Sequence, residues 1–278
     1  MRHIERTNIM KVSSRFAVSA ILLAMLGPYG LAAQIDYRNL DDHRPVSTED
    51  AYPIERYAFE VTAPYRYEAE AGGSKLHLVA PELAYGLLPN AEFGVEAPLA
   101  AVDFGPETDW GLAGLRVFGF YNLNTEGRAL PAVSIRSDLS FPVGSLAGES
   151  TRLTLKGIAT RSWGRTRFHL NVARSFGSDE DLAAAEPAER WAYSLAADQT
   201  FFRQSVVLIG ELAASEAILG APTEVNASLG ARYQWAPTFV LDLGMTRRLR
   251  DDIGPDFAFT LGFSHAFAFR GLMPSGPR

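Results

Sequence analysis

The chain has 278 residues, a formal net charge of −6, no cysteine and an apolar fraction of 47%. Without cysteine it can form no disulfide, thiolate metal site or cysteine nucleophile. The apolar fraction is too low for a bundle of membrane helices but suits a transmembrane β-barrel, in which only alternate strand residues are apolar. The excess of acidic residues argues against nucleic acid as a partner.

Residues 1–33 have the pattern of a secretory signal peptide. Four basic residues precede an 11-residue apolar run from Phe16 to Leu26, and small residues before Gln34 offer a cleavage site. The run is shorter than the roughly 20 residues of a membrane-spanning helix. Met10 is an alternative start, because it begins a compact signal by itself. We therefore predict export from the cytoplasm.

Residues 34–56, "QIDYRNLDDHRPVSTEDAYPIER", are polar, are interrupted by two prolines and show no apolar alternation. Two interpretations stay open. The segment is either a disordered periplasmic leader or a short plug that enters the barrel and pairs its charges with the lumen. The charges available for such pairing are Asp41, Asp42, Arg44, Glu49, Asp50 and Arg56.

From residue 57 onward, apolar and small or polar residues alternate in runs of about ten, which predicts β-strands. The last run is the clearest, because every odd position from Phe257 to Phe269 is large and almost every even position is small. Three runs, 76–85, 112–121 and 205–214, have no clear phase. The twelve expected strands are 57–67, 76–85, 92–100, 112–121, 131–141, 151–160, 166–175, 190–198, 205–214, 224–235, 238–248 and 257–267.

The connections alternate in length. The longer, acidic or Gly/Pro-rich loops are expected at 68–75, 101–111, 142–150, 176–189, 215–223 and 249–256, with mostly shorter turns between them. An even number of strands with short turns at one end is typical of an outer-membrane barrel. Aromatic residues also gather at both ends of the strands, as at two membrane interfaces.

The alternative is a secreted soluble β-sandwich or barrel, but its solvent-facing side would be rich in Lys, Glu, Thr and Gln. Here the second face is mostly Ala, Gly, Ser and Thr. The sequence thus predicts an all-β chain: a twelve-stranded antiparallel transmembrane barrel over residues 57–269, followed by a short tail, 270–278.

Three stretches carry a resemblance to a known family. They are "RPVSTEDAYPIERYAFEV" (44–61), "APELAYGLLPNAEFGVEAPL" (80–99) and "NASLGARYQWAPTFVLDLGMTRRL" (226–249). From about residue 44 to 269 the chain resembles the outer-membrane β-barrels assigned as transporters of the meta-pathway of phenol degradation. The resemblance implies a barrel in the outer membrane of a Gram-negative bacterium that passes small solutes, with hydrophobic or aromatic molecules as candidates.

The strand phases assign a set of charged residues to the lumen. Acidic and basic residues balance in it, so they could line a water-filled pore or form a closed network of ion pairs. The many small inward residues favour a passage for solutes. The expected pore-lining residues are Glu60, Arg66, Glu96, Arg116, Arg136, Asp138, Arg152, Lys156, His169, Asp198, Glu211, Arg232 and Asp242.

The leading functional prediction is a porin-like channel for passive transport of small solutes. The alternative is a non-conducting barrel that acts as adhesin, receptor or structural protein. We do not expect an enzyme, because no serine near His169 shares its face of the strand. Ser264 and His265 are adjacent, but their side chains point to opposite faces. A Ser or Asp close to His169 across strands would favour one.

No cofactor or metal site is expected, since no two histidines lie at ligand spacing. The acidic stretch 177–189 is interpreted as a solvated loop, with cation binding as a weaker hypothesis. The expected partners are outer-membrane lipid and lipopolysaccharide, the barrel-assembly machinery and a small-molecule solute.

Overall fold

The computed structural model describes residues 35–69, 73–103, 108–177, 189–202, 205–217, 223–250 and 254–273. The expected signal peptide lies outside the described residues. The strands are β1 (Ala58–Thr62), β2 (Tyr65–Ala69), β3 (Lys75–Val79), β4 (Glu82–Leu88), β5 (Ala91–Glu96), β6 (Leu99–Asp103), β7 (Thr108–Leu112), β8 (Leu115–Asn124), β9 (Ala132–Phe141), β10 (Arg152–Trp163), β11 (Thr166–Phe176), β12 (Glu189–Phe201), β13 (Val206–Ala217), β14 (Glu224–Ala236), β15 (Phe239–Arg248) and β16 (Phe257–Ala268). A 3-10 helix, η2 (Arg270–Leu272), follows β16.

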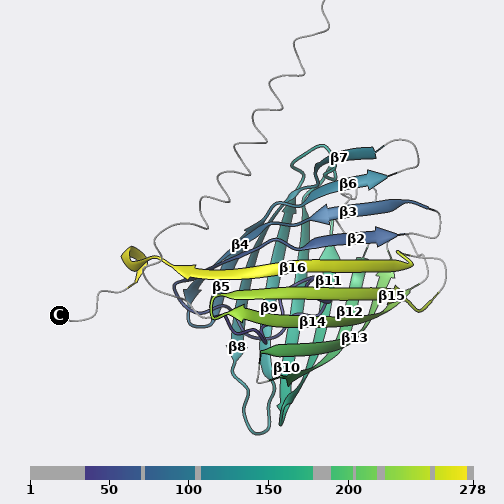
Figure 1. The fold of residues 1–278 in the computed structure, drawn as a ribbon. Helices are drawn as coiled ribbons and strands as arrows, with labels where there is room; N and C mark the ends of the chain where they lie inside the picture. Colours follow the sequence, from purple (N-terminus) through teal and green to yellow (C-terminus); the bar gives the residue numbers. More distant parts are fainter. Residues whose placement is uncertain are drawn as a thin grey trace, which may run out of the picture.

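These segments form one closed antiparallel barrel (Figure 1). Four pairs of segments, β1/β2, β3/β4, β5/β6 and β7/β8, are halves of single strands, so the barrel has twelve strands, as predicted. Closure runs through the last strand. Ala268 at one end of β16 is paired with Ala58 of β1, and Phe257 at the other end is paired with Ala69 of β2.

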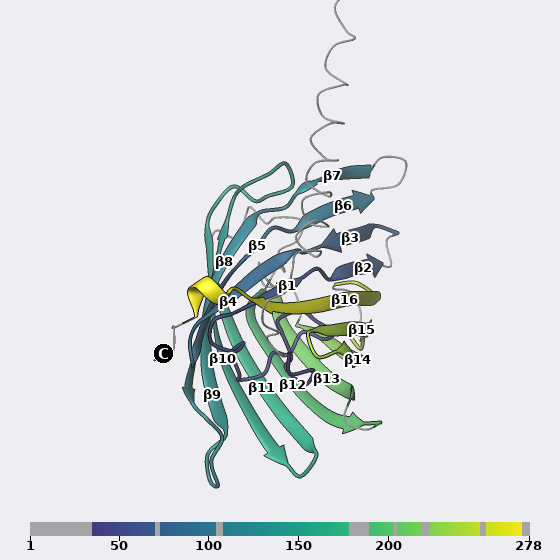
Figure 2. The same ribbon diagram turned by 60° about the vertical axis from the view of Figure 1, so that its left-hand side comes forward.

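The four split strands are broken side by side. Pro64, Pro81 and Pro98 lie in the first three breaks and Gly114 in the fourth. Proline has no N–H for the ladder, so each strand is interrupted at that point. Neighbouring breaks remain joined, because Ala80 N–H donates to the Pro64 carbonyl at 3.0 Å and the two following pairs repeat this contact. Beyond this row, β2, β3, β6 and β7 form a four-stranded panel (Figures 1 and 2).

At the outer edge of this panel, β7 pairs with β6. On the side of β7 away from β6, Leu146 in the connection after β9 donates its N–H to the Leu112 carbonyl at 3.0 Å. Two loop predictions are wrong in length, at 68–75 and 101–111. The panel strands extend to Ala69, Lys75, Asp103 and Thr108, which shortens both connections.

The barrel has an apolar outer face and a polar inner face. In β16 the small residues at even positions are buried, while Leu261 on the opposite face is 49% exposed. Leu229 in the middle of β14 is 73% exposed and Leu212 in β13 is 55% exposed. This is the alternation expected of strands that face lipid outside and a polar lumen inside. Among the described residues, none of the helices has the length and apolar character to cross a membrane.

Candidate functional site

Residues 35–57, called the leader segment below, lie in the barrel lumen. The segment enters at the end with the short turns, where Ile35 N–H donates to the Pro237 carbonyl at 3.0 Å. It returns to the same end, where Tyr57 N–H donates to the Gly86 carbonyl at 2.6 Å, directly before β1. In Figure 2 this part of the chain is drawn in purple within the ring of strands.

Side chains of the barrel wall bind the backbone of the leader segment. The N–H groups of Thr48 and Ile54 donate to the carboxylates of Glu211 and Glu92, both at 2.6 Å. The Glu49 N–H donates to the Asn171 side-chain oxygen at 2.8 Å. A buried backbone N–H without a partner is costly, so these wall residues compensate for the absence of regular secondary structure in the segment.

Arg44 is the centre of one group of buried charges. Its guanidinium donates to Asp242 at 2.7 Å and to Glu60 at 3.2 Å, and it also pairs with Asp41 of the leader segment. Arg232 lies 2.7 Å from the second oxygen of Asp242. Strands β1, β14 and β15 are thereby joined to the leader segment by charge.

A second group of charges lies across the lumen, on β8, β9 and β10. Arg136 donates to Glu49 at 2.9 Å, and its guanidinium lies 3.8 Å from the centre of the Phe118 ring. Lys156 pairs with both Glu49 and Asp42. Because the cations come from the wall and these carboxylates from the leader segment, each part leaves buried charge unpaired without the other.

A third group surrounds Arg167 on β11. Its guanidinium donates to Asp50 of the leader segment at 2.9 Å and to Asp198 of β12. The His169 Nε2–H donates to the same aspartate at 2.9 Å, and the His169 Nδ1 lies 3.0 Å from the Thr160 hydroxyl oxygen.

Thr160, His169 and Asp198 form a hydrogen-bonded row. Asp198 thus lies beside His169 on the neighbouring strand, which is the arrangement that would favour an enzyme. Thr160 is fully buried, however, and its hydroxyl oxygen accepts the N–H of Ala51 at 3.0 Å. The leader segment therefore covers the hydroxyl, which leaves no room at this atom for a substrate carbonyl. In this conformation the row anchors the leader segment.

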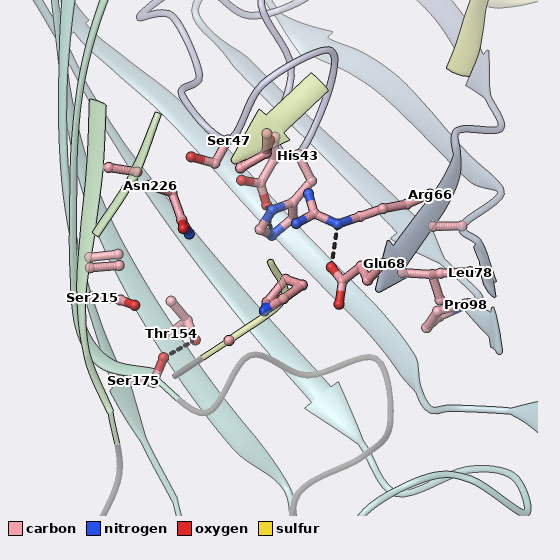
Figure 3. A pocket seen from close by; sticks show the side chains of 18 of the residues that line it. His43, Ser47, Arg66, Glu68, Leu78, Pro98, Thr154, Ser175, Ser215 and Asn226 are labelled. Carbon is pink, nitrogen blue, oxygen red and sulfur yellow. Dashed lines mark hydrogen bonds and ion pairs between the residues drawn. The ribbon is translucent and has the colours of Figure 1, made fainter. Parts of the chain in front are cut away.

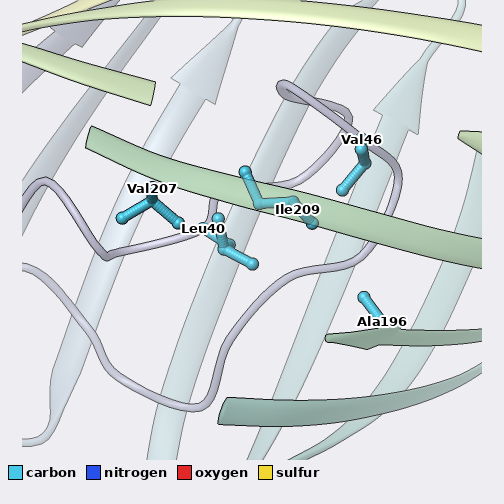
Figure 4. Close-up of a cluster of buried hydrophobic side chains, with 5 residues drawn as sticks. All are labelled: Leu40, Val46, Ala196, Val207 and Ile209. Atoms are coloured by element: carbon cyan, nitrogen blue, oxygen red, sulfur yellow. The ribbon is translucent and has the colours of Figure 1, made fainter. Parts of the chain in front are cut away.

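Apolar residues of the leader segment complete the contact. Each of the four buried apolar clusters contains at least one of them. Figure 4 shows the cluster in which Leu40 and Val46 pack against Ala196, Val207 and Ile209.

Pro45 lies against Gly230 and Gly244 of neighbouring strands. A Cβ atom at Gly230 would lie 2.8 Å from the Pro45 ring, and one at Gly244 would overlap the Pro45 carbonyl. Glycine at both positions permits this close approach.

A cavity of about 670 Å³ lies between the leader segment and the loop end of the barrel. Asp42, His43 and Ser47 of the leader segment form part of its lining (Figure 3). On β2, Arg66 pairs with Glu68 (Figure 3), and neutral hydroxyl and amide residues from β10 to β15 line another part. Leu76, Leu78 and Val102 of the panel add apolar surface.

All thirteen residues expected in the lumen lie on the inner face. Seven line the cavity: Arg66, Glu96, Arg116, Asp138, Arg152, Lys156 and Glu211. The other six are buried deeper against the leader segment or its partners: Glu60, Arg136, His169, Asp198, Arg232 and Asp242.

Sequence reasoning missed Glu82, Glu92 and Arg167, which also face inward. Arg167 is two positions from His169 and Glu92 is four from Glu96, so extending the strand phases finds both. Glu82 lies in a run of unclear phase. Arg56 of the leader segment is exposed, and its guanidinium lies 4.5 Å from the centre of the Tyr57 ring instead of facing the lumen.

In the described part of the chain, no group of three or more His, Asp or Glu side chains is arranged to hold a metal ion. The acidic loop considered for cation binding lies almost entirely outside the described residues, since 178–188 are not described.

The barrel is similar to solved outer-membrane proteins. One is the COG4313 outer membrane channel from Pseudomonas putida F1, with 14% identity and a TM-score of 0.60, covering 82% of this chain and 100% of that chain. Another is the KdgM porin in complex with disordered oligogalacturonate, with 13% identity and a TM-score of 0.50, covering 74% and 99%. At these identities the likeness establishes the fold, an outer-membrane-type barrel.

No curated protein matches the sequence. A family model described as "Protein of unknown function (DUF3187)" matches residues 100–267, which is more than half of the chain. This match does not confirm the resemblance to transporters of the phenol meta-pathway, which stays a prediction. The chain belongs to the DUF3187 family.

Proposed function

We propose that the protein is a channel of the Gram-negative outer membrane for passive passage of small solutes, in which the leader segment is a displaceable plug. Solutes enter the cavity at the loop end, and passage further requires the leader segment to move. The amphipathic lining of the cavity, with apolar residues on the panel and hydroxyl groups elsewhere, supports solutes that include hydrophobic or aromatic molecules.

The observation that carries this proposal is how the leader segment is bound. Between the backbone hydrogen bonds at its two ends, its contacts to the wall are side-chain hydrogen bonds, ion pairs and small apolar clusters. By contrast, the wall strands are joined to one another by backbone ladders. The leader segment can therefore leave the lumen while the barrel stays intact, and its removal leaves the inward charges facing water.

The buried ion pairs also favour the second candidate, a non-conducting barrel that serves as adhesin, receptor or structural protein. Arg44, Arg136 and Arg167 link the leader segment to several wall strands. A segment held so firmly would close the lumen permanently. Whether ions pass decides between the two functions.

The first test is single-channel conductance of the refolded mature protein in a planar bilayer, with and without residues 34–56. We expect small or rare openings with the segment and larger, discrete steps without it. If both proteins fold and both are silent, the channel function is wrong and the non-conducting barrel is favoured.

A disulfide tests the movement of the leader segment without deleting it. The hydroxyls of Thr48 and Ser194 are 2.8 Å apart, and the chain has no cysteine, so Thr48→Cys/Ser194→Cys can form one defined disulfide. We expect oxidation to suppress the openings and reduction to restore them.

The matched control joins two wall strands. The Ser228 and Thr246 hydroxyls on β14 and β15 are 3.0 Å apart, so Ser228→Cys/Thr246→Cys forms a comparable disulfide that leaves the leader segment free. If Thr48→Cys/Ser194→Cys conducts equally in its oxidised and reduced forms, the leader segment does not need to move, and the plug proposal is wrong.

A further inference from the structure

The outer face of the barrel carries cations in two different settings. Arg161 lies near the end with the short turns, and its guanidinium donates to the carbonyls of Gly127, Arg128 and Leu130. It also lies 3.6 Å from Glu126. The protein itself therefore satisfies this outward arginine.

Arg174, near the loop end, has a different environment. Its partners in the ladder are Leu155 of β10 and Trp191 of β12, so apolar side chains flank it on both sides. The guanidinium carbon lies 4.7 Å from the centre of the Trp191 ring and 5.2 Å from that of Phe176. Stacking on two rings restricts the guanidinium before any ligand binds.

Arg247 on β15 also points outward at the loop end. It lies opposite Ala227 of β14 and Phe257 of β16, and its side chain is exposed. Within the residues that the structure describes, neither Arg174 nor Arg247 has a carboxylate partner. Both thus present a cation to the membrane interface at the loop end.

A cation at the edge of the hydrocarbon region is stabilised by an anion in the interface. The guanidinium group binds phosphate through two parallel hydrogen bonds. Outer-membrane barrels have their short turns on the periplasmic side and their longer loops outside, so the loop end of this barrel meets the outer leaflet, where lipid A supplies the phosphates. We propose that Arg174 on β11 and Arg247 on β15, which β12, β13 and β14 separate, are two independent docking positions for the phosphate groups of lipid A in lipopolysaccharide.

The inference rests on the proposed membrane orientation but not on conduction, so the two can fail separately. The test is native mass spectrometry of the mature protein in detergent with added lipid A. We compare the unmodified protein with Arg174→Gln/Arg247→Gln, and bisphosphorylated lipid A with dephosphorylated lipid A and phosphatidylglycerol. Heat-dependent gel migration establishes that the variant is folded.

We expect each of the two positions to bind bisphosphorylated lipid A roughly 5-fold more weakly in the double variant, as for the loss of one interfacial arginine contact. Arg128→Gln/Arg165→Gln is the matched control, because it removes two exposed arginines from turns at the other end. This control should bind lipid A like the unmodified protein.

Several outcomes would overturn the proposal. They are equal binding by the Arg174/Arg247 variant, an equal loss in the control, or equal binding of dephosphorylated lipid A or phosphatidylglycerol by the unmodified protein. The comparison of lipids needs no substitution, so it decides the matter even if the variant does not fold.

Discussion

Arg44 of the leader segment and Asp242 of β15 form a buried ion pair with an Nη1–Oδ2 distance of 2.7 Å. Both side chains are almost completely buried. Arg232 of β14 lies beside the second oxygen of the same aspartate. The Asp242 carboxylate therefore pairs with two guanidinium groups, that of Arg44 from the leader segment and that of Arg232 from the wall. The stability of the barrel and the position of the leader segment are therefore coupled at Asp242.

We expect Asp242→Asn to lower the free energy of unfolding by about 3 kcal/mol, because it leaves two buried guanidinium groups undercompensated. Urea unfolding in lipid vesicles, followed by tryptophan fluorescence, measures the change. Asp256→Asn is the control, since that carboxylate pairs with Arg248 at the exposed loop end and should contribute at most about 1 kcal/mol. Equal losses in the two variants would contradict the coupling.

Gly244 is predicted to control how well the leader segment docks. In Gly244→Val the new side chain overlaps the Pro45 carbonyl, so the leader segment must shift from the wall. We expect a glutamate-specific protease to cleave after Glu49, which is buried in the unmodified protein, many times faster in the variant.

The matched control is Gly210→Val on β13, because a Cβ atom there meets nothing within 4 Å. It should leave the bond after Glu49 protected. Protection of this bond in both variants would mean that docking of the leader segment does not require glycine at position 244.

Most strands of the barrel could be predicted from the sequence. Strands such as β14 and β16 have one face toward the lumen and one toward the outside, so apolar and small or polar residues alternate along them with a period of two. The three runs of unclear phase have a common cause. Phe118 and Phe120 on β8 and Val207 on β13 face inward but pack on apolar leader residues, so both faces of these strands are apolar. Ala84 on β4 packs on the leader segment in the same way.

The path of the leader segment could not be predicted. Its partners are as far as 220 positions away in the sequence, as for Arg44 and Ser264, and its irregular backbone has no period. The row of strand breaks did leave a signal, since Pro64, Pro81 and Pro98 recur at a constant spacing. Proline within an alternating run usually marks the end of a strand. The three prolines therefore indicated strand ends and not breaks that lie side by side in neighbouring strands.

Removing residues 34–56 should also change which ions pass. Four carboxylates of the leader segment pair with wall cations: Asp41, Asp42, Glu49 and Asp50. Only Arg44 pairs in the opposite sense, with wall carboxylates. The deletion thus leaves the wall with three more uncompensated positive charges than negative ones.

We expect the reversal potential in a KCl gradient to shift toward that of chloride relative to the full chain. Lys156→Met in the deleted protein should reduce this shift, because Lys156 is a cation that the deletion unpairs. A shift toward potassium would contradict the assignment of these pairs.

The outer face gives a prediction about membrane insertion. Leu229 lies in the middle of β14 and is 73% exposed, so it should face the centre of the bilayer. Leu249 is also exposed but lies just after β15 at the loop end. We expect Leu229→Arg to destabilise the folded barrel in lipid by about 2–4 kcal/mol and Leu249→Arg by at most about 1 kcal/mol, because the cost of a charge falls with distance from the midplane.

Reversible unfolding in vesicles and folding yield in thin bilayers measure both changes. If the outer face met water, the two exposed leucines would be equivalent and both substitutions would be tolerated. Only a membrane explains a cost that depends on depth.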